Sequence, residues 1–181
     1  MTEDERYRRY LAGDREAGDE LMQQCKDELI RYLDAFLHNR EDAEDLMLEC
    51  FTVILVDCPK IRDGNFRPYL FRMARYKAMR QKKAWLRQES FELDESFPGG
   101  EGIPEEAVWK NERSLILQRC LNRIAPQYRE AIWLVYVLGM SYAQAAEVMH
   151  GTEKRVENCL RNGKKQLRRE LEKEGITHED I

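Results

Sequence analysis

Residues 121–171 read LNRIAPQYREAIWLVYVLGMSYAQAAEVMHGTEKRVENCLRNGKKQLRREL and contain the clearest structural pattern in the chain. Ser141 can cap a short helix through Met149, a turn falls at residues 150–152, and a longer helix starts near Glu153. Small and apolar side chains lie where the two helices would cross, at Ala145, Ala146, Val156, Leu160, Leu167 and Leu171. The stretch predicts a helix-turn-helix, although a plain helical hairpin would give a similar pattern.

Polar and cationic side chains gather near the start of the longer helix, away from its apolar stripe. In helix-turn-helix motifs this end of the second helix contacts base edges in the major groove, and cations further along contact phosphates. The candidate DNA contacts are Thr152, Lys154, Arg155, Asn158, Arg161 and Lys165. The pattern favours a surface that binds duplex DNA.

Helical periodicity also dominates the rest of the chain, and Gly and Pro fall at few places. The expected helices cover about residues 3–12, 14–38, 41–56, 66–87, 105–122, 127–138, 142–149 and 153–173. The prediction is weakest at 131–138, where several residues have strand propensity, but no second strand is available nearby to pair with this segment. The sequence therefore predicts an all-α protein.

Residues 89–112 separate two groups of expected helices. Their first part, ESFELDESFPGGEGIP, combines acidic residues, Gly and Pro with little periodicity, so it cannot bury enough apolar surface to fold alone. We expect two small helical domains at 1–88 and 113–175, joined by a flexible acidic linker at 89–112 and followed by a short tail at 176–181.

The net charge is only −4, but charge alternates in blocks along the chain. Residues 1–60 hold eight Lys and Arg against 16 Asp and Glu, whereas residues 61–88 hold nine against one. Residues 89–112 are acidic again, and residues 113–181 hold twelve cations against nine acids. Because a local cationic surface attracts phosphate even on an acidic protein, the blocks predict two separate cationic surfaces, one in each domain.

The first cationic block is the expected helix FRPYLFRMARYKAMRQKKAWLR at 66–87. Four of its residues are expected to face inward: Tyr69, Leu70, Met73 and Ala74. Cations interleaved with rings such as Phe71, Tyr76 and Trp85 are typical of single-strand binding, because the rings can stack on unpaired bases, although aromatic residues alone would also fit a core. The candidate contacts here are Arg62, Asn65, Arg67, Arg72, Arg75, Tyr76, Lys77, Arg80 and Lys83.

The expected helix at 41–56 has a further candidate surface. Residues at three- and four-residue spacing predict one buried stripe, formed by Ala43, Leu46, Met47, Cys50, Phe51 and Ile54. Leu48, Thr52 and Val56 lie off this stripe, close to Asp45 and Glu49. Exposed apolar residues can form a partner-binding face, but a second packed helix would explain them as well.

Enzymatic, metal-binding and membrane-spanning interpretations have no residues to support them. The longest apolar stretch, at 131–140, is far shorter than the roughly 20 residues that cross a bilayer, and the N-terminus is charged where a signal peptide is apolar. The five cysteines are scattered without a CxxC pair, which favours reduced and mostly buried thiols. Catalytic motifs are also missing from the sequence. We expect a cytoplasmic protein with no catalytic residues, metal site or cofactor.

The order of these pieces resembles the extracytoplasmic-function (ECF) group of sigma-70 family factors over nearly the whole chain. Residues 43–46 (AEDL), followed by Glu49 and Phe51, look like the family's motif on the helix that docks onto the clamp helices of the polymerase largest subunit. Residues 69–80 look like the WL..IAR run in the family's helix that binds and opens the minus-10 promoter element. The resemblance in the first domain therefore covers both candidate surfaces.

In the second domain, residues 124–126 (IAP) and the run from Met140 to Leu160 look like the family's segment that reads the minus-35 element. The chain departs from the family pattern at several positions. Tyr76 stands where Asn is usual, and His150 takes a turn position where Gly is common. Gly163, inside the last expected helix, should cost about 0.5–1 kcal/mol relative to Ala.

The resemblance implies a sigma factor that binds core RNA polymerase, melts the minus-10 element and recognises the minus-35 element. It assigns the contacts of the 62–83 region to the minus-10 element and those of 152–165 to the minus-35 element. It implies contacts with the polymerase clamp helices and flap, and the residues assigned to polymerase binding are Glu44, Asp45, Leu48, Glu49 and Thr52. An anti-sigma factor is expected as a further partner.

Two alternatives remain open from the residues alone. A helix-turn-helix regulator that acts without core polymerase would leave the basic aromatic helix unexplained. The other alternative is a helical adaptor that binds neither polymerase nor nucleic acid, and a pull-down of polymerase subunits from a lysate would discriminate it.

Overall fold

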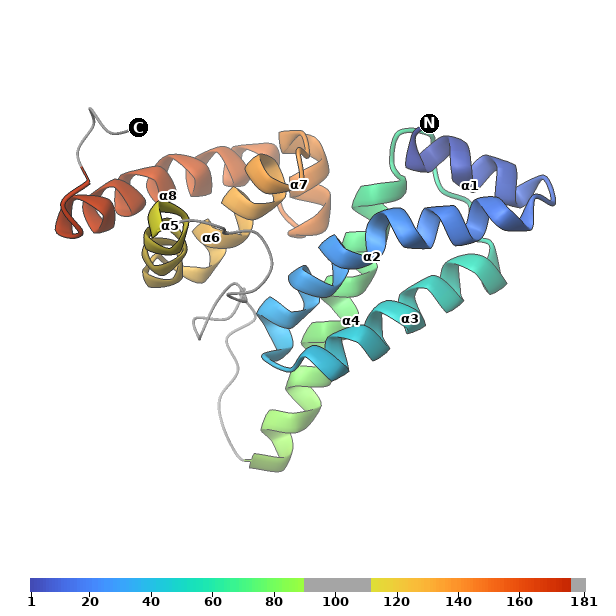
Figure 1. The fold of residues 1–181 in the computed structure, drawn as a ribbon, viewed down its shortest axis with the longest axis horizontal. Coiled ribbons are helices and arrows are strands. Elements are labelled where there is room, and N and C mark those ends of the chain that lie inside the picture. The colour runs from blue at the N-terminus through green and yellow to red at the C-terminus, as the bar shows by residue number, and fades with distance from the viewer. Residues whose placement is uncertain (90–111, 177–181) are drawn as a thin grey trace. The chain divides into compact units, whose positions relative to one another are not determined.

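The computed structural model describes residues 1–89 and 112–176, with side chains described for 1–85 and 115–176. The chain divides into two compact units, one on each side of the gap between these ranges. Every regular element in the described ranges is helical, so the all-α prediction is confirmed (Figure 1). Within these ranges, no helix is both long and apolar enough to cross a membrane.

Unit 1 contains α1 (Glu3–Leu11), α2 (Arg15–Leu37), α3 (Arg40–Asp57) and α4 (Phe66–Glu89). The long helix α2 packs against each of the other three (Figure 1). Its start is fixed by Asp14, whose carboxylate accepts a hydrogen bond from the Ala17 amide, and α3 starts in the same way at Asn39. Thr2 caps α1 in a capping box with Glu5, so side-chain caps mark the starts of α1, α2 and α3.

The core of unit 1 lies between α2, α3 and α4. The buried residues of α3 are the six of the predicted stripe, and Leu48, Thr52 and Val56 are exposed as expected. On α4, Leu70 and Ala74 are buried, and Tyr69 and Met73 are half-buried. Phe71 is a correction: its side chain is fully buried, and its ring lies 5.2 Å from that of Tyr32. It belongs to the core because α2 covers that side of α4.

Unit 2 contains α5 (Glu112–Arg123), α6 (Pro126–Ile132), η1 (Trp133–Val137), α7 (Tyr142–Val148) and α8 (Glu153–Lys173). The long helix α8 packs against α5, α6 and α7. The helix expected at 127–138 exists, but its second half is the π-helix η1, in which the Leu138 amide bonds to the Trp133 carbonyl at 3.0 Å. The two crossed helices α7 and α8 are formed as predicted.

Gly163 lies in the middle of α8, where α6 crosses it. A Cβ atom at this position would lie 3.0 Å from Ile132 Cδ1 and 3.0 Å from Tyr128 Cβ. The glycine therefore lets the two helices approach more closely than an alanine would, and this close packing explains a residue that is costly for a helix on its own.

The remaining expectations fall mostly on residues outside the described ranges. The predicted linker at 89–112 lies outside them except for its two end residues, and the predicted start of the fifth helix at 105 also lies outside. The tail at 176–181 lies outside except for Ile176. The domain boundaries at 1–88 and 113–175 stay predictions.

Candidate nucleic-acid interface and polymerase-docking groove

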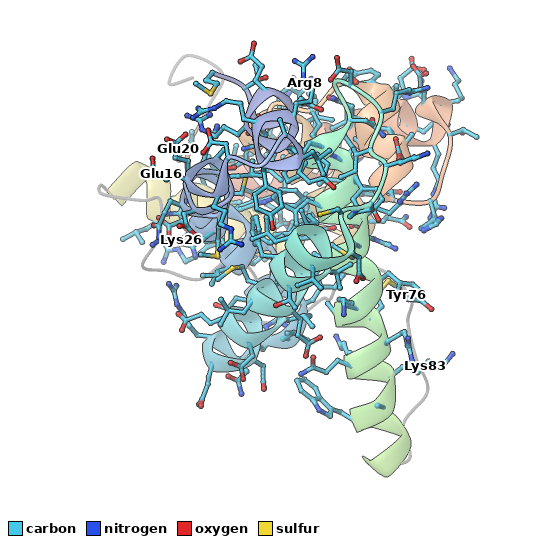
Figure 2. The ribbon with its side chains drawn as sticks, turned by 90° about the vertical axis from the view of Figure 1, so that its right-hand side faces the viewer. Arg8, Glu16, Glu20, Lys26, Tyr76 and Lys83 are labelled. Carbon is cyan, nitrogen blue, oxygen red and sulfur yellow. The ribbon has the colours of Figure 1, made fainter. Side chains whose placement is uncertain are left out.

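The α4 surface carries exposed cations around an exposed aromatic ring. Tyr76 is 56% exposed, and the Arg80 guanidinium lies 5.7 Å from the centre of its ring. One helical turn earlier, Arg72 lies 5.6 Å from the ring of Tyr69. Figure 2 shows Tyr76 and Lys83 on the side of α4 that faces away from α3. A solvent-exposed ring flanked by cations can stack on an unpaired base while the cations contact phosphates.

The other predicted contacts of this surface lie close to it or just before it. Arg62 is exposed in the loop between α3 and α4, and Asn65 is half-buried at the end of that loop. Arg75 is half-buried on α4, and its Nη1 lies 3.1 Å from Met79 Sδ. The structure thus brings most of the predicted set together along one helix and the loop that leads into it.

Arg67 differs from the rest of the set, because carboxylates of two other helices hold it. Its Nε lies 3.3 Å from Glu3 Oε1 and its Nη2 lies 2.5 Å from Glu28 Oε2. Its side chain is only 22% exposed. Burial disfavours the Arg67 charge, but the two carboxylates outweigh burial, and the pKa of the guanidinium is raised overall. Arg67 is therefore held in ion pairs within unit 1 and is less available to nucleic acid than the other predicted contacts.

A groove between α3 and α4 contains four of the five residues predicted to bind polymerase. It is lined by Asp45, Leu48, Glu49, Thr52, Val53 and Lys77. Leu48 is 50% exposed and lines this groove together with the acidic residues Asp45 and Glu49. Glu44, the fifth predicted residue, instead pairs with Arg40 at 3.1 Å on the surface of α3. Val53 is a lining residue that the sequence pattern missed.

Lys77 and Glu49 link the two predicted surfaces of unit 1. Lys77 was predicted to contact nucleic acid and Glu49 to contact polymerase, yet Lys77 Nζ lies 3.2 Å from Glu49 Oε2 across the groove. The lysine side chain is 28% exposed and the glutamate side chain 62% exposed. Such a solvent-exposed pair contributes little stability, so either partner can exchange it for another charge.

The start of α8 carries the second candidate interface. Thr152 caps the helix by accepting a hydrogen bond from the Arg155 amide at 3.2 Å. The cations of the predicted set are exposed: Lys154, Arg155, Arg161 and Lys165. Asn158 is half-buried and accepts a hydrogen bond from Arg161 at 2.8 Å. The capped helix end therefore presents the polar and cationic residues that base reading requires.

The turn before α8 is tightly specified by its own residues. Ser141 and Gln144 form a reciprocal capping box at the start of α7. His150 adopts a left-handed backbone conformation with φ of 50°, the conformation that a glycine adopts without strain. The turn between α7 and α8 therefore holds a non-glycine residue in the left-handed region.

A shallow groove beside the start of α8 contains residues that the sequence pattern missed. Thr152, Lys154, Arg155 and Asn158 line it together with Gln127, Tyr128, Cys159 and Asn162. Gln127 and Tyr128 come from α6, which packs against α8. Only the three-dimensional packing brings them to this surface, because they precede Thr152 by more than twenty residues.

Comparison with known protein families gives one match in each of the two units. A family model described as Sigma-70 region 2 matches residues 21–90, and a model described as Sigma-70, region 4 matches residues 114–167. The first match spans α3 and α4, and the second spans the helix-turn-helix. Each candidate surface therefore lies within one of the two matched regions.

Three curated relatives are each described as an ECF RNA polymerase sigma factor. SigE of Mycolicibacterium smegmatis is 27% identical over 86% of this chain and 62% of its own length. SigW of Bacillus subtilis is 25% identical over 92% of this chain and 95% of its own length. SigM of Bacillus subtilis is 23% identical over 83% of this chain and 92% of its own length. This chain thus spans less than two thirds of SigE but nearly all of SigW and SigM.

Two solved structures share the fold. CnrH, in complex with the cytosolic domain of CnrY, has a TM-score of 0.63 at 20% identity and covers 94% of this chain and 97% of its own. The sigma factor RpoE of Bartonella quintana, in complex with the anti-sigma factor NepR, has a TM-score of 0.61 at 18% identity and covers 84% of this chain and 97% of its own. With both sigma-70 regions matched in order and ECF relatives along most of its length, this chain belongs to the ECF group of the sigma-70 family of RNA polymerase sigma factors.

Proposed function

We propose that the protein directs promoter-specific transcription initiation by binding core RNA polymerase and contacting one promoter at two elements, with no catalytic step of its own. The observation that carries this proposal is the α4 surface, where the exposed Tyr76 ring lies among cations. A regulator that binds only duplex DNA has no use for such a surface, because duplex bases are already stacked. The polymerase would supply the chemistry.

The minus-10 element is assigned to α4 and the preceding loop. Its unpaired strand would bind across Arg62, Asn65, Arg72, Arg75, Tyr76, Lys77, Arg80 and Lys83. Stacking of a base on an aromatic ring is worth roughly 1–3 kcal/mol, so Tyr76 alone can help hold an opened base pair. The neighbouring cations would add a salt-dependent contribution.

The polymerase is assigned to the groove between α3 and α4. An exposed leucine with Asp45 and Glu49 beside it suits a helical partner that offers an apolar side chain flanked by cations. Glu44 and Thr52 extend the same face of α3. The clamp helices of the largest subunit are the proposed partner, by family resemblance, and the flap is the proposed partner of unit 2.

The minus-35 element is assigned to the start of α8. Arg155 and Lys154 project from the first turn, and Asn158 and Arg161 follow one turn later, so together with Thr152 and Lys165 they can follow one major groove. The relative RpoE is solved with an anti-sigma factor, and on that basis we propose an anti-sigma partner for this chain too.

Run-off transcription with purified core polymerase tests the proposal. The wild-type protein should support initiation at one start site on a matching promoter, and core polymerase alone should not. Lack of initiation on every promoter of a genomic library would refute the proposal. Tight operator binding by the protein without polymerase would favour a conventional helix-turn-helix regulator instead.

A matched pair of variants tests the docking groove. Leu48→Asp places a charge on the rim of the groove and should lower the affinity for core polymerase by about tenfold or more, because it buries an unpaired charge in the interface. Val56→Asp makes the same change on the same helix, at a side chain that is 74% exposed and outside the groove, and should leave the affinity unchanged. Equal affinities for the two variants would refute this assignment of the groove.

A further inference from the structure

The loop between α3 and α4 is held by a helix that the proposed function does not use. Residues 58–65 contain no regular helix, yet they carry Arg62 and Asn65 of the proposed minus-10 surface. Figure 1 shows this loop passing alongside α1, which precedes both α3 and α4 in the chain. The contacts between α1 and the loop therefore join residues that are more than fifty positions apart.

One contact fixes the beginning of the loop. The Tyr7 hydroxyl donates a hydrogen bond to the Pro59 carbonyl at 2.7 Å. Tyr7 is only 3% exposed, and its ring lies 5.3 Å from that of the fully buried Phe66, the first residue of α4. Burial is the main reason that the pKa of Tyr7 is raised to about 12, so its hydroxyl stays a donor at any physiological pH.

Three further residues of α1 hold the end of the loop and the start of α4. The Asp4 carboxylate accepts hydrogen bonds from the backbone amides of Asn65 and Phe66, both at 3.2 Å. Amides at a helix start have no partner within the helix, and a carboxylate satisfies them while it interacts favourably with the helix dipole. Arg8, which Figure 2 labels on α1, pairs with Asp63 at 3.2 Å. Glu3 adds its ion pair with Arg67, the second residue of α4.

We infer that α1 positions the α3–α4 loop for promoter opening, with Asp4 and Tyr7 as positioning residues that present Arg62 and Asn65 to the unpaired strand. The inference rests on the proposed function. Asp4, Tyr7 and Arg8 of α1 contact the loop near both of its ends, and Glu3 of the same helix contacts the first turn of α4. A loop fixed at both ends pays less conformational entropy when it binds.

The chain offers a closely matched pair of variants. Tyr7→Phe removes the hydrogen bond to the Pro59 carbonyl, and Tyr10→Phe removes an equivalent bond from the same helix to the Leu55 carbonyl of α3 at 2.6 Å. Both changes delete one hydroxyl and leave the ring in place. A merely structural role of α1 would make the two variants alike. A positioning role makes only Tyr7→Phe affect the loop.

Hydrogen exchange of the free protein is the first measurement, because it does not depend on the proposed function. The amides of residues 60–65 should exchange faster in Tyr7→Phe and in Asp4→Ala than in the wild type, and Tyr10→Phe should leave them unchanged. Unchanged exchange in Tyr7→Phe, or equal increases in Tyr7→Phe and Tyr10→Phe, would overturn the inference.

Promoter opening is the second measurement, made with the holoenzyme and a fluorescent base analogue in the minus-10 element. Tyr7→Phe should slow opening by about three- to tenfold, the range expected for one lost hydrogen bond, with core binding unchanged. Asp4→Asn, which keeps an acceptor, should recover part of the loss seen in Asp4→Ala. Faster loop exchange with normal opening would overturn the positioning role. Failure of the wild type to open any promoter would refute the proposed function, and the exchange result would still stand.

Discussion

Replacement of Gly163 by alanine tests whether close helix packing, and not chance, accounts for a glycine inside α8. An added Cβ would lie 3.0 Å from Ile132 Cδ1 and 3.0 Å from Tyr128 Cβ. The Ile132 methyl is the end of a flexible side chain and can turn away. The Tyr128 Cβ is attached directly to the α6 backbone, so it moves only if α6 moves.

Two opposing effects set the size of the change. Alanine improves the helix propensity of the position by about 0.5–1 kcal/mol. Forcing an extra methyl group between packed helices typically costs about 1–3 kcal/mol. We therefore expect Gly163→Ala to lower the free energy of unfolding of unit 2 by about 1 kcal/mol. Asn162→Ala is the matched control, because Asn162 is exposed on the same turn and should gain up to about 0.5 kcal/mol from propensity alone.

Urea denaturation followed by tryptophan fluorescence measures the change. Trp133 is 4% exposed in unit 2, and Phe replacements at Trp85 and Trp109 leave it as the reporter of this unit. Linear extrapolation then gives the free energy of unfolding for each variant. If Gly163→Ala is as stable as the wild type or more stable, the α6–α8 contact does not require a glycine and the packing explanation is refuted.

Three further predictions concern thiols, a buried acid and DNA reading. Burial raises the pKa of both Cys25 and Cys50 to about 12, whereas Cys58 is exposed. Peptide mass spectrometry after brief maleimide treatment at pH 8 should therefore find Cys58 labelled first. Equal labelling of Cys25 in the native protein would contradict this prediction. Burial raises the pKa of the Asp34 carboxyl group and outweighs the attraction of Arg40 and His38. Protonated Asp34 therefore contributes most to stability below the ordinary aspartate pKa, and this contribution is lost as the pH rises through the raised pKa. Asp34→Asn should therefore raise the melting temperature at pH 7, and the difference in melting temperature from the wild type should shrink as the pH falls. A difference that is constant with pH would contradict the prediction. Arg155→Ala should weaken binding to the minus-35 element by about 1–3 kcal/mol if Arg155 reads a base edge, and an unchanged holoenzyme footprint would exclude that role.

The helical periodicity of the sequence was sufficient to predict the apolar stripe of α3 and the crossing of α7 and α8. In both cases the structure shows a side-chain cap at the start of the amphipathic pattern, at Asn39 and at Ser141, so that local chemistry and burial agree. The resemblance to the ECF group was equally accessible, because it depends on the order of short motifs and not on their packing.

Contacts between distant residues account for what the sequence did not predict. In the sequence Arg67 looks like one more cation of a basic helix. Its partners Glu3 and Glu28 precede it by 64 and 39 residues, so the ion pairs form only in the folded structure. Phe71 was placed with the outward rings because nothing in the pattern of α4 shows that α2 covers that side. The π-helical turn at 133–137 was missed since its hydrogen-bond register leaves no mark on composition.

The ion pairs of Arg67 bear on how salt should act on the first domain. The sequence has nine cations between residues 61 and 88, but two carboxylates of unit 1 hold Arg67. A cation held in this way neutralises no phosphate and displaces no counterions from a single strand, and each phosphate contact contributes a slope of about −0.7 in a plot of log affinity against log salt concentration. The salt dependence of strand binding should therefore be shallower, by about 0.7 in that slope, than it would be if Arg67 also bound a phosphate.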